Sequence, residues 1–447
     1  MLPWARLYSV NQNRTGISSL LDSPPALFSP APPATSSSAD NRKLIELIFF
    51  DAGGGHRASA MALRRVIDQQ QRPWQVAVSN LRDVLEPADL LRTLTRVRAE
   101  DLYNGLLKYD LTITVGPMLP ILHALVRRLH SRAVSHLARH WRGSRPHLVV
   151  SMIPHFNRTL LDGLRAADHA QGRTPTPMVT VMTDLADYPP NFWIEPQDQY
   201  LICGTSFAAS QAAHIGYSPD RILRTSGMII RPEFYDSPDL SRAGERRRIG
   251  LHPDLPTGLV MFGGYGSSRM LTIAQRLAES RLPTQMIFLC GNNLRLRRKL
   301  AAMRLPFPHF IEGFTPHIPY FMRLSDYFVG KPGPGSLSEA LVMGLPVIVE
   351  RTVSTMVHER FNTDWILRNG FGFVLRSFGE IADAVAAMLD SSRMARFRRQ
   401  VGAYRNRAVF EIPDLLDSIM SRHRLDDCSS VKHPFVSVRA ASQQPSA

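Results

Sequence analysis

Three glycines followed by a histidine, Gly53-Gly54-Gly55-His56, are the residues of this chain whose order most directly suggests chemistry. They come directly after the mostly apolar run Leu44–Phe50 and directly before the helix-like stretch Arg57–Gln69. A strand, a glycine turn and a helix form anion or sugar sites in α/β proteins, because the helix N-terminus offers unpaired N–H groups and a partial positive charge. An imidazole held at that place can take a proton from a bound hydroxyl group.

Two other interpretations of this turn stay open from the residues alone. The glycines can serve only to bend the chain, with His56 capping the helix and no ligand present. The turn also fits a dinucleotide fingerprint, since Gly53, Gly55 and Ala58 follow the order G-x-G-x-x-A and acidic residues come further on. A single match of this kind has little specificity, so the motifs in the second half of the chain are needed to choose between these interpretations.

The stretch Gly330–Leu341, which reads GKPGPGSLSEAL, is the second strong signal. Gly335 and Ser336 open a helix whose N–H groups can receive a diphosphate. Glu339 lies one turn into that helix, where its carboxylate can accept two hydrogen bonds from the vicinal hydroxyls of a ribose. The alternative is a capping box between Ser336 and Glu339 with no ligand. The order of a Walker loop is absent.

A third glycine turn, Gly263–Ser267, follows another apolar run and precedes another helix-like stretch. Three glycine turns in three strand-to-helix connections are unlikely to arise by chance. Two of them lie in the second half of the chain, so we expect a nucleotide there, with Gly264 and Ser267 beside its phosphates. The first turn, with His56, would then serve the acceptor.

The elements that position these turns alternate between strands and helices along the chain. We expect strands at 44–50, 75–78, 148–152, 178–182, 199–203, 259–262, 285–289, 327–329 and 346–349, and helices at 57–69, 103–108, 121–142, 158–168, 270–280, 295–303, 336–343 and 391–407. Such alternation implies right-handed crossovers and parallel sheets. Two sheets in series predict two domains, a hinge near 226–232, and glycine loops that face the cleft between them.

The composition of the 447 residues, 44% hydrophobic and 20% charged, is that of a globular protein with sizeable cores. The three cysteines are far apart and form no C-x-x-C pair, which argues against a disulfide framework or a zinc site. No apolar run is long enough for a membrane-spanning helix, and residues 1–40 lack a continuous apolar stretch, so we expect no secretory signal. Residues 1–40 are rich in Pro and Ser and predict a disordered leader; a transit peptide and an over-called start are the alternatives.

The formal charge of +15 requires an anionic partner or surface. The segment 117–145 holds six arginines and no acid, with leucines on one helical face, Arg127 and Arg128 on the other, and Arg132 at the border. A basic amphipathic helix of this kind can lie in a lipid interface, or it can cover the protein core with its apolar face. Binding to nucleic acid is a further alternative, but Trp141 is the only aromatic residue among these basic ones.

Taken together, the motifs resemble the GT-B glycosyltransferases that act on lipids, in particular the monogalactosyldiacylglycerol synthases and the bacterial diacylglycerol glycosyltransferases. The transferase that makes peptidoglycan lipid II is similar but more distant. The resemblance covers residues 44–400. It rests on the order and spacing of DAGGGHRASA (51–60), TDL (183–185), GGYGS (263–267), CGNN (290–293), KPGPGSLSEAL (331–341), GLP (344–346) and VHERFN (357–362).

The resemblance implies a role for each matching residue. His56 matches the catalytic base, with Asp184 as its orienting carboxylate, and Gly54 and Gly55 adjoin the acceptor. The resemblance also implies a set of residues that bind the sugar donor: Arg231, Gly264, Ser267, Phe314, Gly335, Ser336, Glu339, His358, Glu359 and Asn362. Phe314 matches the position whose backbone binds uracil, and Glu339 the glutamate that binds ribose. His358 stands where the family usually has Gln, which leaves the choice of sugar open.

The fold implied is α/β, GT-B, with two Rossmann-like parallel-sheet domains facing an interdomain cleft. The expected divisions are a leader at 1–41, an acceptor- and membrane-binding domain at 42–226, a UDP-sugar domain at 227–392, helices that return to the first domain at 393–425, and a disordered tail at 426–447.

The activity implied is transfer of a hexose, galactose or glucose, from a UDP-sugar to a membrane lipid, with inversion at the anomeric carbon. Diacylglycerol is the expected acceptor. We expect no metal ion and no cofactor other than the donor substrate, no nucleic acid, and contact of Arg127, Arg128 and Arg132 with an anionic membrane surface. The expected location is the cytoplasm, on the face of the inner membrane. A UDP-sugar epimerase, an NAD-dependent oxidoreductase built on Gly53–Ala58 and a nucleic-acid-binding protein are the rival interpretations.

Overall fold

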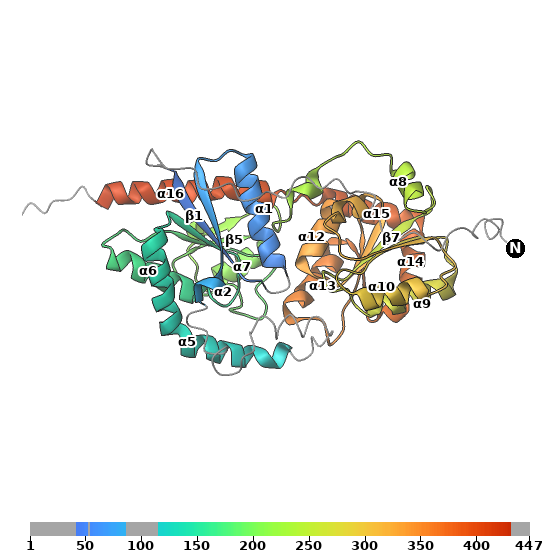
Figure 1. Ribbon diagram of the computed structural model, residues 1–447, viewed down its shortest axis with the longest axis horizontal. Coiled ribbons are helices and arrows are strands. Elements are labelled where there is room, and N and C mark those ends of the chain that lie inside the picture. The colour runs from blue at the N-terminus through green and yellow to red at the C-terminus, as the bar shows by residue number, and fades with distance from the viewer. Residues whose placement is uncertain (1–41, 52–53, 86–114, 431–447) are drawn as a thin grey trace, which may run out of the picture.

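Two six-stranded sheets, each with all its strands parallel, form the framework of the computed structural model, which describes residues 42–51, 54–85 and 115–430 (Figure 1). The first sheet has the order β2-β1-β3-β4-β5-β6 and the second the order β12-β11-β10-β7-β8-β9. The strands are β1 (Lys43–Phe49), β2 (Trp74–Asn80), β3 (Leu148–Ser151), β4 (Met178–Val181), β5 (Tyr200–Cys203), β6 (Ile222–Arg224), β7 (Thr257–Met261), β8 (Gln285–Leu289), β9 (His309–Glu312), β10 (Tyr327–Gly330), β11 (Val347–Glu350) and β12 (Gly372–Leu375).

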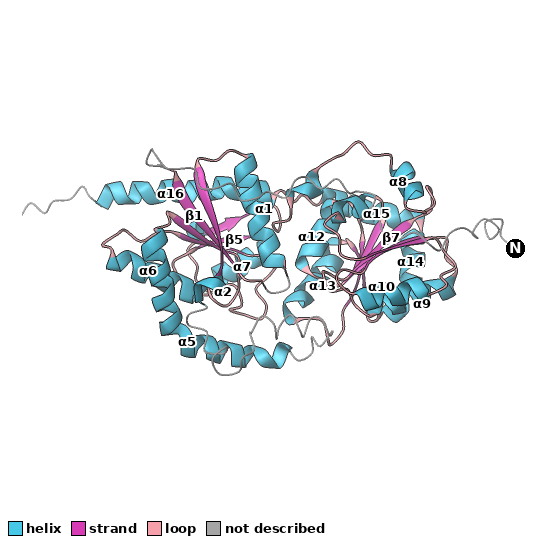
Figure 2. Ribbon diagram, viewed as in Figure 1, coloured by secondary structure: helices cyan, strands magenta, loops and turns pink. Residues whose placement is uncertain are grey.

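Helices cover both sheets, and Figure 2 shows the two α/β units side by side. The first unit carries α1 (Gly55–Gln69), α2 (Leu81–Leu85), α5 (Val115–Ser144), α6 (Asn157–Ala170), α7 (Ser206–His214) and α16 (Ala408–Ser430). The second carries α8 (Arg242–Arg248), α9 (Arg269–Ser280), α10 (Leu294–Ala302), α11 (Ile318–Arg323), α12 (Pro334–Val342), α13 (Val357–Asn369), α14 (Ile381–Leu389) and α15 (Ser391–Ala403). The predicted α/β class with two parallel-sheet domains is confirmed.

The central strands are almost wholly apolar because helices cover both of their faces. The chain from Ile45 to Phe49 in β1, and all of β7, β8 and β10, is buried. The three strands that the sequence did not predict, β6, β9 and β12, are short and less completely buried. β6 and β9 form one edge of each sheet and β12 the other edge of the second. The predicted helix at 103–108 lies outside the described residues.

The last helix, α16, returns from the second unit to the first. Val409, Ile412 and Leu416 are buried in one core with α1 and β1. The segment that leads from the first unit to the second is hydrogen-bonded to α16, because the Ser226 backbone N–H and hydroxyl both donate to Glu411, at 2.8 and 2.6 Å. Asn406 Nδ2 donates to the Met228 carbonyl at 2.8 Å. The chain therefore crosses between the two units twice, and these hydrogen bonds join the two crossing segments.

The basic helix α5 packs on the protein along the part whose side chains are described. Leu137, Ala138 and Trp141 are buried in a core with α6. The two helices approach closely at Gly163, where a Cβ would lie 2.6 Å from the Cβ of Leu137. The apolar face of this part of α5 thus covers the core, while Arg132 is exposed. The side chains of Arg127 and Arg128 lie outside the described ones. In the described part of the chain, no helix is both long and apolar enough to cross a bilayer.

A buried carboxylate fastens α5 to the first sheet. Glu46 of β1 accepts hydrogen bonds from Ser79 Oγ at 2.6 Å, His140 Nε2 at 2.7 Å and Trp141 Nε1 at 3.0 Å. Burial would raise the pKa of Glu46, but its three donors lower the pKa below the usual value. The hydrogen bond to Glu46 raises the pKa of His140.

We expect His140→Ala to destabilise the protein by about 2 kcal/mol near pH 6, the range for a hydrogen bond to a charged group. The raised pKa of His140 contributes stability below its unfolded pKa of about 6.5, and this stability is lost as the pH rises through the folded pKa. Urea midpoints at pH 6 and pH 9 measure the effect, with His136→Ala on the same helix as control. An equal loss at both pH values would contradict a charged pair.

Candidate active site

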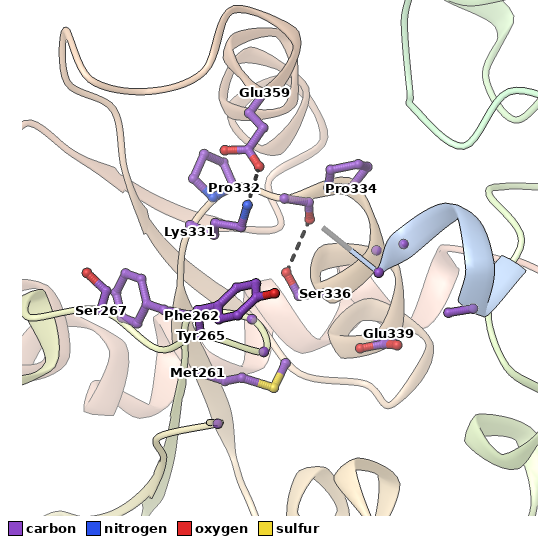
Figure 3. A pocket seen from close by; sticks show the side chains of 18 of the residues that line it. Met261, Phe262, Tyr265, Ser267, Lys331, Pro332, Pro334, Ser336, Glu339 and Glu359 are labelled. Carbon is purple, nitrogen blue, oxygen red and sulfur yellow. Dashed lines mark hydrogen bonds and ion pairs between the residues drawn. The ribbon is translucent and has the colours of Figure 1, made fainter. Parts of the chain in front are cut away.

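A cleft of about 720 Å³ lies between the two units and is lined by the loops that follow the carboxyl ends of the strands. The first unit contributes the turn at the start of α1 and the segment after β4. The second contributes the glycine turn after β7, the segment after β9, and the 331–339 segment after β10 (Figure 3). Ligands of open parallel sheets bind at this end of the strands.

This cleft brings together most of the residues that the sequence singled out. The lining includes Gly54, Gly55, His56, Asp184, Arg231, Gly264, Ser267, Phe314, Gly335, Ser336, Glu339, His358 and Glu359. Asn362 lies behind the wall, fully buried, and its Nδ2 donates to the Pro332 carbonyl at 2.8 Å. Asn362 therefore shapes the 331–335 segment and is not part of the lining. Arg132, on α5, is not part of the lining either.

His56 stands in the first turn of α1, two residues after Gly54, whose φ of 80° is a backbone conformation that favours glycine. Its Nδ1 is 3.0 Å from the Thr183 hydroxyl. Burial and the nearby His358 lower the pKa of His56 to about 4, against the opposite effect of a hydrogen bond with the Met152 backbone. The imidazole is therefore neutral at physiological pH and able to accept a proton.

Asp184 has a different partner from the one expected. Its Oδ2 accepts a hydrogen bond of 2.7 Å from the indole Nε1 of Trp193, and the hydrogen bond of His56 goes to Thr183. Burial raises the pKa of Asp184, while His358 and the indole N–H act in the other direction. The Trp193 ring lies 5.8 Å from the His56 ring, so it contacts both groups. The hydrogen bonds of Asp184 and His56 thus go to different partners, and the Trp193 ring lies beside both side chains.

The sequence analysis missed Thr183, Phe192 and Lys331, which line the cleft, and Trp193, which lies behind Asp184. Thr183 directly precedes Asp184 in the TDL motif, and this was the available signal for it. Trp193 is fully buried and is held at its backbone N–H by Asp187 at 2.6 Å. Nothing in the spacing of the sequence connects Trp193 to His56, because they come from different loops of the sheet.

The wall of the cleft that the second unit contributes is built around the start of α12. Gly333 precedes this helix and Ser336 donates from its hydroxyl to the Gly333 carbonyl at 3.3 Å (Figure 3). No side chain caps the helix, so the alternative of a capping box between Ser336 and Glu339 is not what the structure shows. Pro334, the first residue of α12, has no N–H group, so the first N–H groups of the helix belong to Gly335 and Ser336, which line the cleft. Unpaired N–H groups at the start of a helix can bind an anion.

Glu339 is enclosed beneath this turn. Burial raises the pKa of Glu339 to about 7, and the positive charge of Arg231 opposes that rise. A carboxyl group with this pKa is close to half ionised at neutral pH, so a ligand that offers hydroxyl donors would favour the ionised form. Arg231 also lines the cleft and donates to the Pro316 carbonyl at 3.3 Å.

The glycine turn after β7 requires its glycines. Gly263 and Gly266 have φ of 70° and 62°, and a Cβ on Gly266 would lie 2.5 Å from the Cys290 carbonyl oxygen. Gly291 in the next loop packs equally tightly, since its Cβ would lie 2.3 Å from the Gly264 carbonyl oxygen. The two loops support each other and hold Ser267 and Gly264 at the wall of the cleft.

The start of α13 closes the cleft with a charged pair and an aromatic contact. Lys331 Nζ lies 2.7 Å from Glu359 Oε1 (Figure 3). Burial would raise the pKa of Glu359, but Lys331 and His358 lower it below the usual value. The His358 ring stacks on Phe192 of the first unit, with centroids 5.6 Å apart and planes 7° from parallel. Within the described residues, no group of three or more His, Cys, Asp or Glu side chains could hold a metal ion.

Two parallel-sheet domains that face each other across such a cleft define the GT-B architecture. Solved structures confirm this fold: the MnaA–UDP complex of S. aureus superposes with a TM-score of 0.54 at 16% identity, covering 86% of this chain and 98% of that one. MurG of Acinetobacter baumannii gives 0.54 at 12% identity, with 84% and 99% covered. No family model matches the chain.

Among curated proteins, the chain is similar to the chloroplastic monogalactosyldiacylglycerol synthase of Spinacia oleracea, with 27% identity over 373 residues. The match covers 79% of this chain and 67% of the relative, so the chain spans about two thirds of that relative's length. The resemblance drawn from the motifs is thereby confirmed: the chain has the GT-B fold and is similar in sequence to the monogalactosyldiacylglycerol synthases.

Proposed function

We propose that this protein transfers a hexose from a UDP-sugar to the hydroxyl group of a membrane lipid, diacylglycerol, with inversion at the anomeric carbon. The observation that carries the proposal is a single cleft with a neutral imidazole, His56, on one wall and the start of α12 with Glu339 on the other. The comparisons support it, since a similar curated protein is a monogalactosyldiacylglycerol synthase and a solved structure with this fold is a complex with UDP.

The reaction follows from the chemistry of each wall. His56 takes the proton of the acceptor hydroxyl while that oxygen attacks the anomeric carbon. The bond between the anomeric carbon and the phosphate oxygen breaks, and UDP leaves with the electron pair. The N–H groups at the start of α12, the turn at Ser267 and the Arg231 guanidinium stabilise the negative charge that develops on the diphosphate. Glu339 binds the ribose, and His358 and Glu359 lie where the sugar hydroxyls would be.

Incubation with a panel of labelled UDP-sugars and membrane lipids, followed by chromatography of the lipid fraction, tests the proposal. We expect one hexose, galactose or glucose, to move to diacylglycerol and the product to have the inverted configuration. Turnover should continue in excess chelator, since neither acid–base nor electrostatic catalysis here calls for a metal ion. Isomerisation of the sugar with no labelled lipid would favour the epimerase instead.

Trp193→Phe should lower kcat about tenfold, because it removes the donor to Asp184 and leaves a buried carboxylate without its partner. The affinity for UDP should not change, since Trp193 is not part of the donor wall. Trp74→Phe is the matched control, because Trp74 is also buried in the first domain but does not adjoin the cleft. An unchanged kcat in Trp193→Phe would remove Trp193 from the positioning of His56.

Contact with an anionic membrane through Arg127, Arg128 and Arg132 forms part of the same proposal. The proposal is supported by residues 117–145, which hold six arginines and no acidic residue, and by the exposure of the Arg132 side chain. Flotation with vesicles that do or do not contain anionic lipid measures it, and we expect binding to the anionic vesicles that falls as salt is added. Equal binding to neutral vesicles would contradict electrostatic docking.

A further inference from the structure

A second cavity, of about 160 Å³, lies at the other end of the first sheet, and the proposed reaction makes no use of it. Lys43 at the start of β1, and His147 and Pro177, which directly precede β3 and β4, form part of its lining. The residues of the catalytic cleft follow the opposite ends of these strands. The cavity is therefore separate from the cleft.

Four basic side chains from four segments converge on this cavity. They are Lys43 of β1, His147 before β3, Arg173 of the loop before β4, and His423 of α16. Two threonines, Thr174 and Thr176, add hydroxyl groups, and Pro177 and Met420 complete the lining. No acidic side chain is among these lining residues.

The side chains of this cluster are held by local hydrogen bonds: Arg173 Nη2, one nitrogen of a guanidinium group with five N–H donors, donates to the Pro146 carbonyl at 3.4 Å. His147 Nδ1 accepts the Leu44 N–H at 3.0 Å, so in the neutral ring the proton is on Nε2, which is then a donor. The carboxylate behind the wall, Asp168, is buried and accepts from both the N–H and the hydroxyl of Thr176, at 2.6 and 2.8 Å. That carboxylate fastens Thr176 in the 173–177 loop and is not among the residues that line the cavity.

We propose that this cavity binds a phosphate-type oxyanion, either a free phosphate or the phosphomonoester of a lipid headgroup. Such an anion matches the chemistry of the lining, because guanidinium, ammonium and imidazole N–H donors form short charge-assisted hydrogen bonds with phosphate oxygens. The volume accommodates a tetrahedral oxyanion with a few waters. Because His423 and Met420 belong to α16, the bound anion fastens the end of that helix to the first sheet.

Thermal unfolding in phosphate, compared with chloride at equal ionic strength, provides the test. We expect phosphate to raise the unfolding midpoint of the wild-type protein and to slow tryptic cleavage after Arg422 in α16. Arg173→Glu, and the double variant Arg173→Ala with His423→Ala, should weaken the phosphate response about tenfold or more in apparent affinity. Arg139→Glu, an exposed arginine of the same domain outside the cavity, should keep the full response.

Two further arms identify the source of the anion. A response to glycerol phosphate in solution assigns the site to a free phosphomonoester, and a response only to vesicles containing a phosphomonoester lipid assigns it to a headgroup. Either result supports the site if Arg173→Glu abolishes it. A response of equal size in the wild type and in both variants would overturn the proposal, as would a wild-type protein that responds to neither phosphate, glycerol phosphate nor the vesicles.

Discussion

His56→Ala abolishes lipid glycosylation while leaving the affinity for UDP within about twofold of the wild-type value; this is the largest effect we expect. A positioned general base contributes about 10²–10⁴ in rate. The imidazole of His56 lines the acceptor side of the cleft, and the predicted nucleotide contacts lie on the other side. Initial rates with saturating donor measure the loss, and calorimetry with UDP measures binding.

Thr183→Val is the matched companion to that experiment. Valine keeps the shape of threonine but cannot hydrogen bond to His56 Nδ1, which is now 3.0 Å from the hydroxyl. We expect a fall of about tenfold in kcat, smaller than for His56→Ala, because the base remains but its ring orientation is less restricted. Unchanged activity in His56→Ala would end the assignment of this histidine as the base, whatever Thr183→Val does.

Glu339→Gln weakens UDP binding about tenfold or more and removes its pH dependence; this is the second large effect. A carboxylate that accepts hydrogen bonds from both ribose hydroxyls loses at least one charge-assisted bond when it becomes an amide. Calorimetric titration with UDP between pH 6 and pH 8 measures both parts of the prediction. Glu279→Gln, an exposed acid of the same domain, serves as control.

The sign of the pH effect follows from the raised pKa of Glu339, about 7. Below this pH the carboxyl group is mostly protonated, so binding must first remove a proton, and the affinity for UDP rises as the pH increases through 7. In the variant this dependence disappears. In the variant, a fall in kcat/KM as the pH decreases towards 4 would then reflect protonation of His56, whose lowered pKa leaves it neutral above that pH. A UDP affinity that is flat from pH 6 to 8 in the wild type contradicts this role for Glu339.

The sequence predicted the framework of the fold because the central strands of a parallel sheet are nearly continuous apolar runs. β1, β7, β8 and β10 are of this kind, and each was predicted to within a few residues. The edge strands β6, β9 and β12 were missed, since each has only three or four residues, is incompletely buried and pairs on one side only. Their position depends on the neighbouring strand, which no local pattern encodes.

The candidate site was predictable as far as glycine turns mark it. A turn such as Gly263–Ser267 can be recognised in the sequence by its glycines. The structure shows why Gly266 is needed, since a Cβ at this position would lie 2.5 Å from the Cys290 carbonyl oxygen. The hydrogen bond from Trp193 to Asp184 was not predictable, because a buried tryptophan looks like any other core residue until its indole N–H has a partner. The same holds for the contact between Phe192 and His358, which come from different domains.

The return of α16 to the first sheet means that the two halves of this polypeptide are not separable modules. A fragment truncated before Ala408 would expose the apolar surface that Val409, Ile412 and Leu416 now cover, and would aggregate or misfold. Fusion partners and labels are therefore better attached beyond this helix than inserted between the lobes. For the same reason, substitutions that disrupt the packing of α16 would destabilise the first sheet, which is formed by the N-terminal half of the chain.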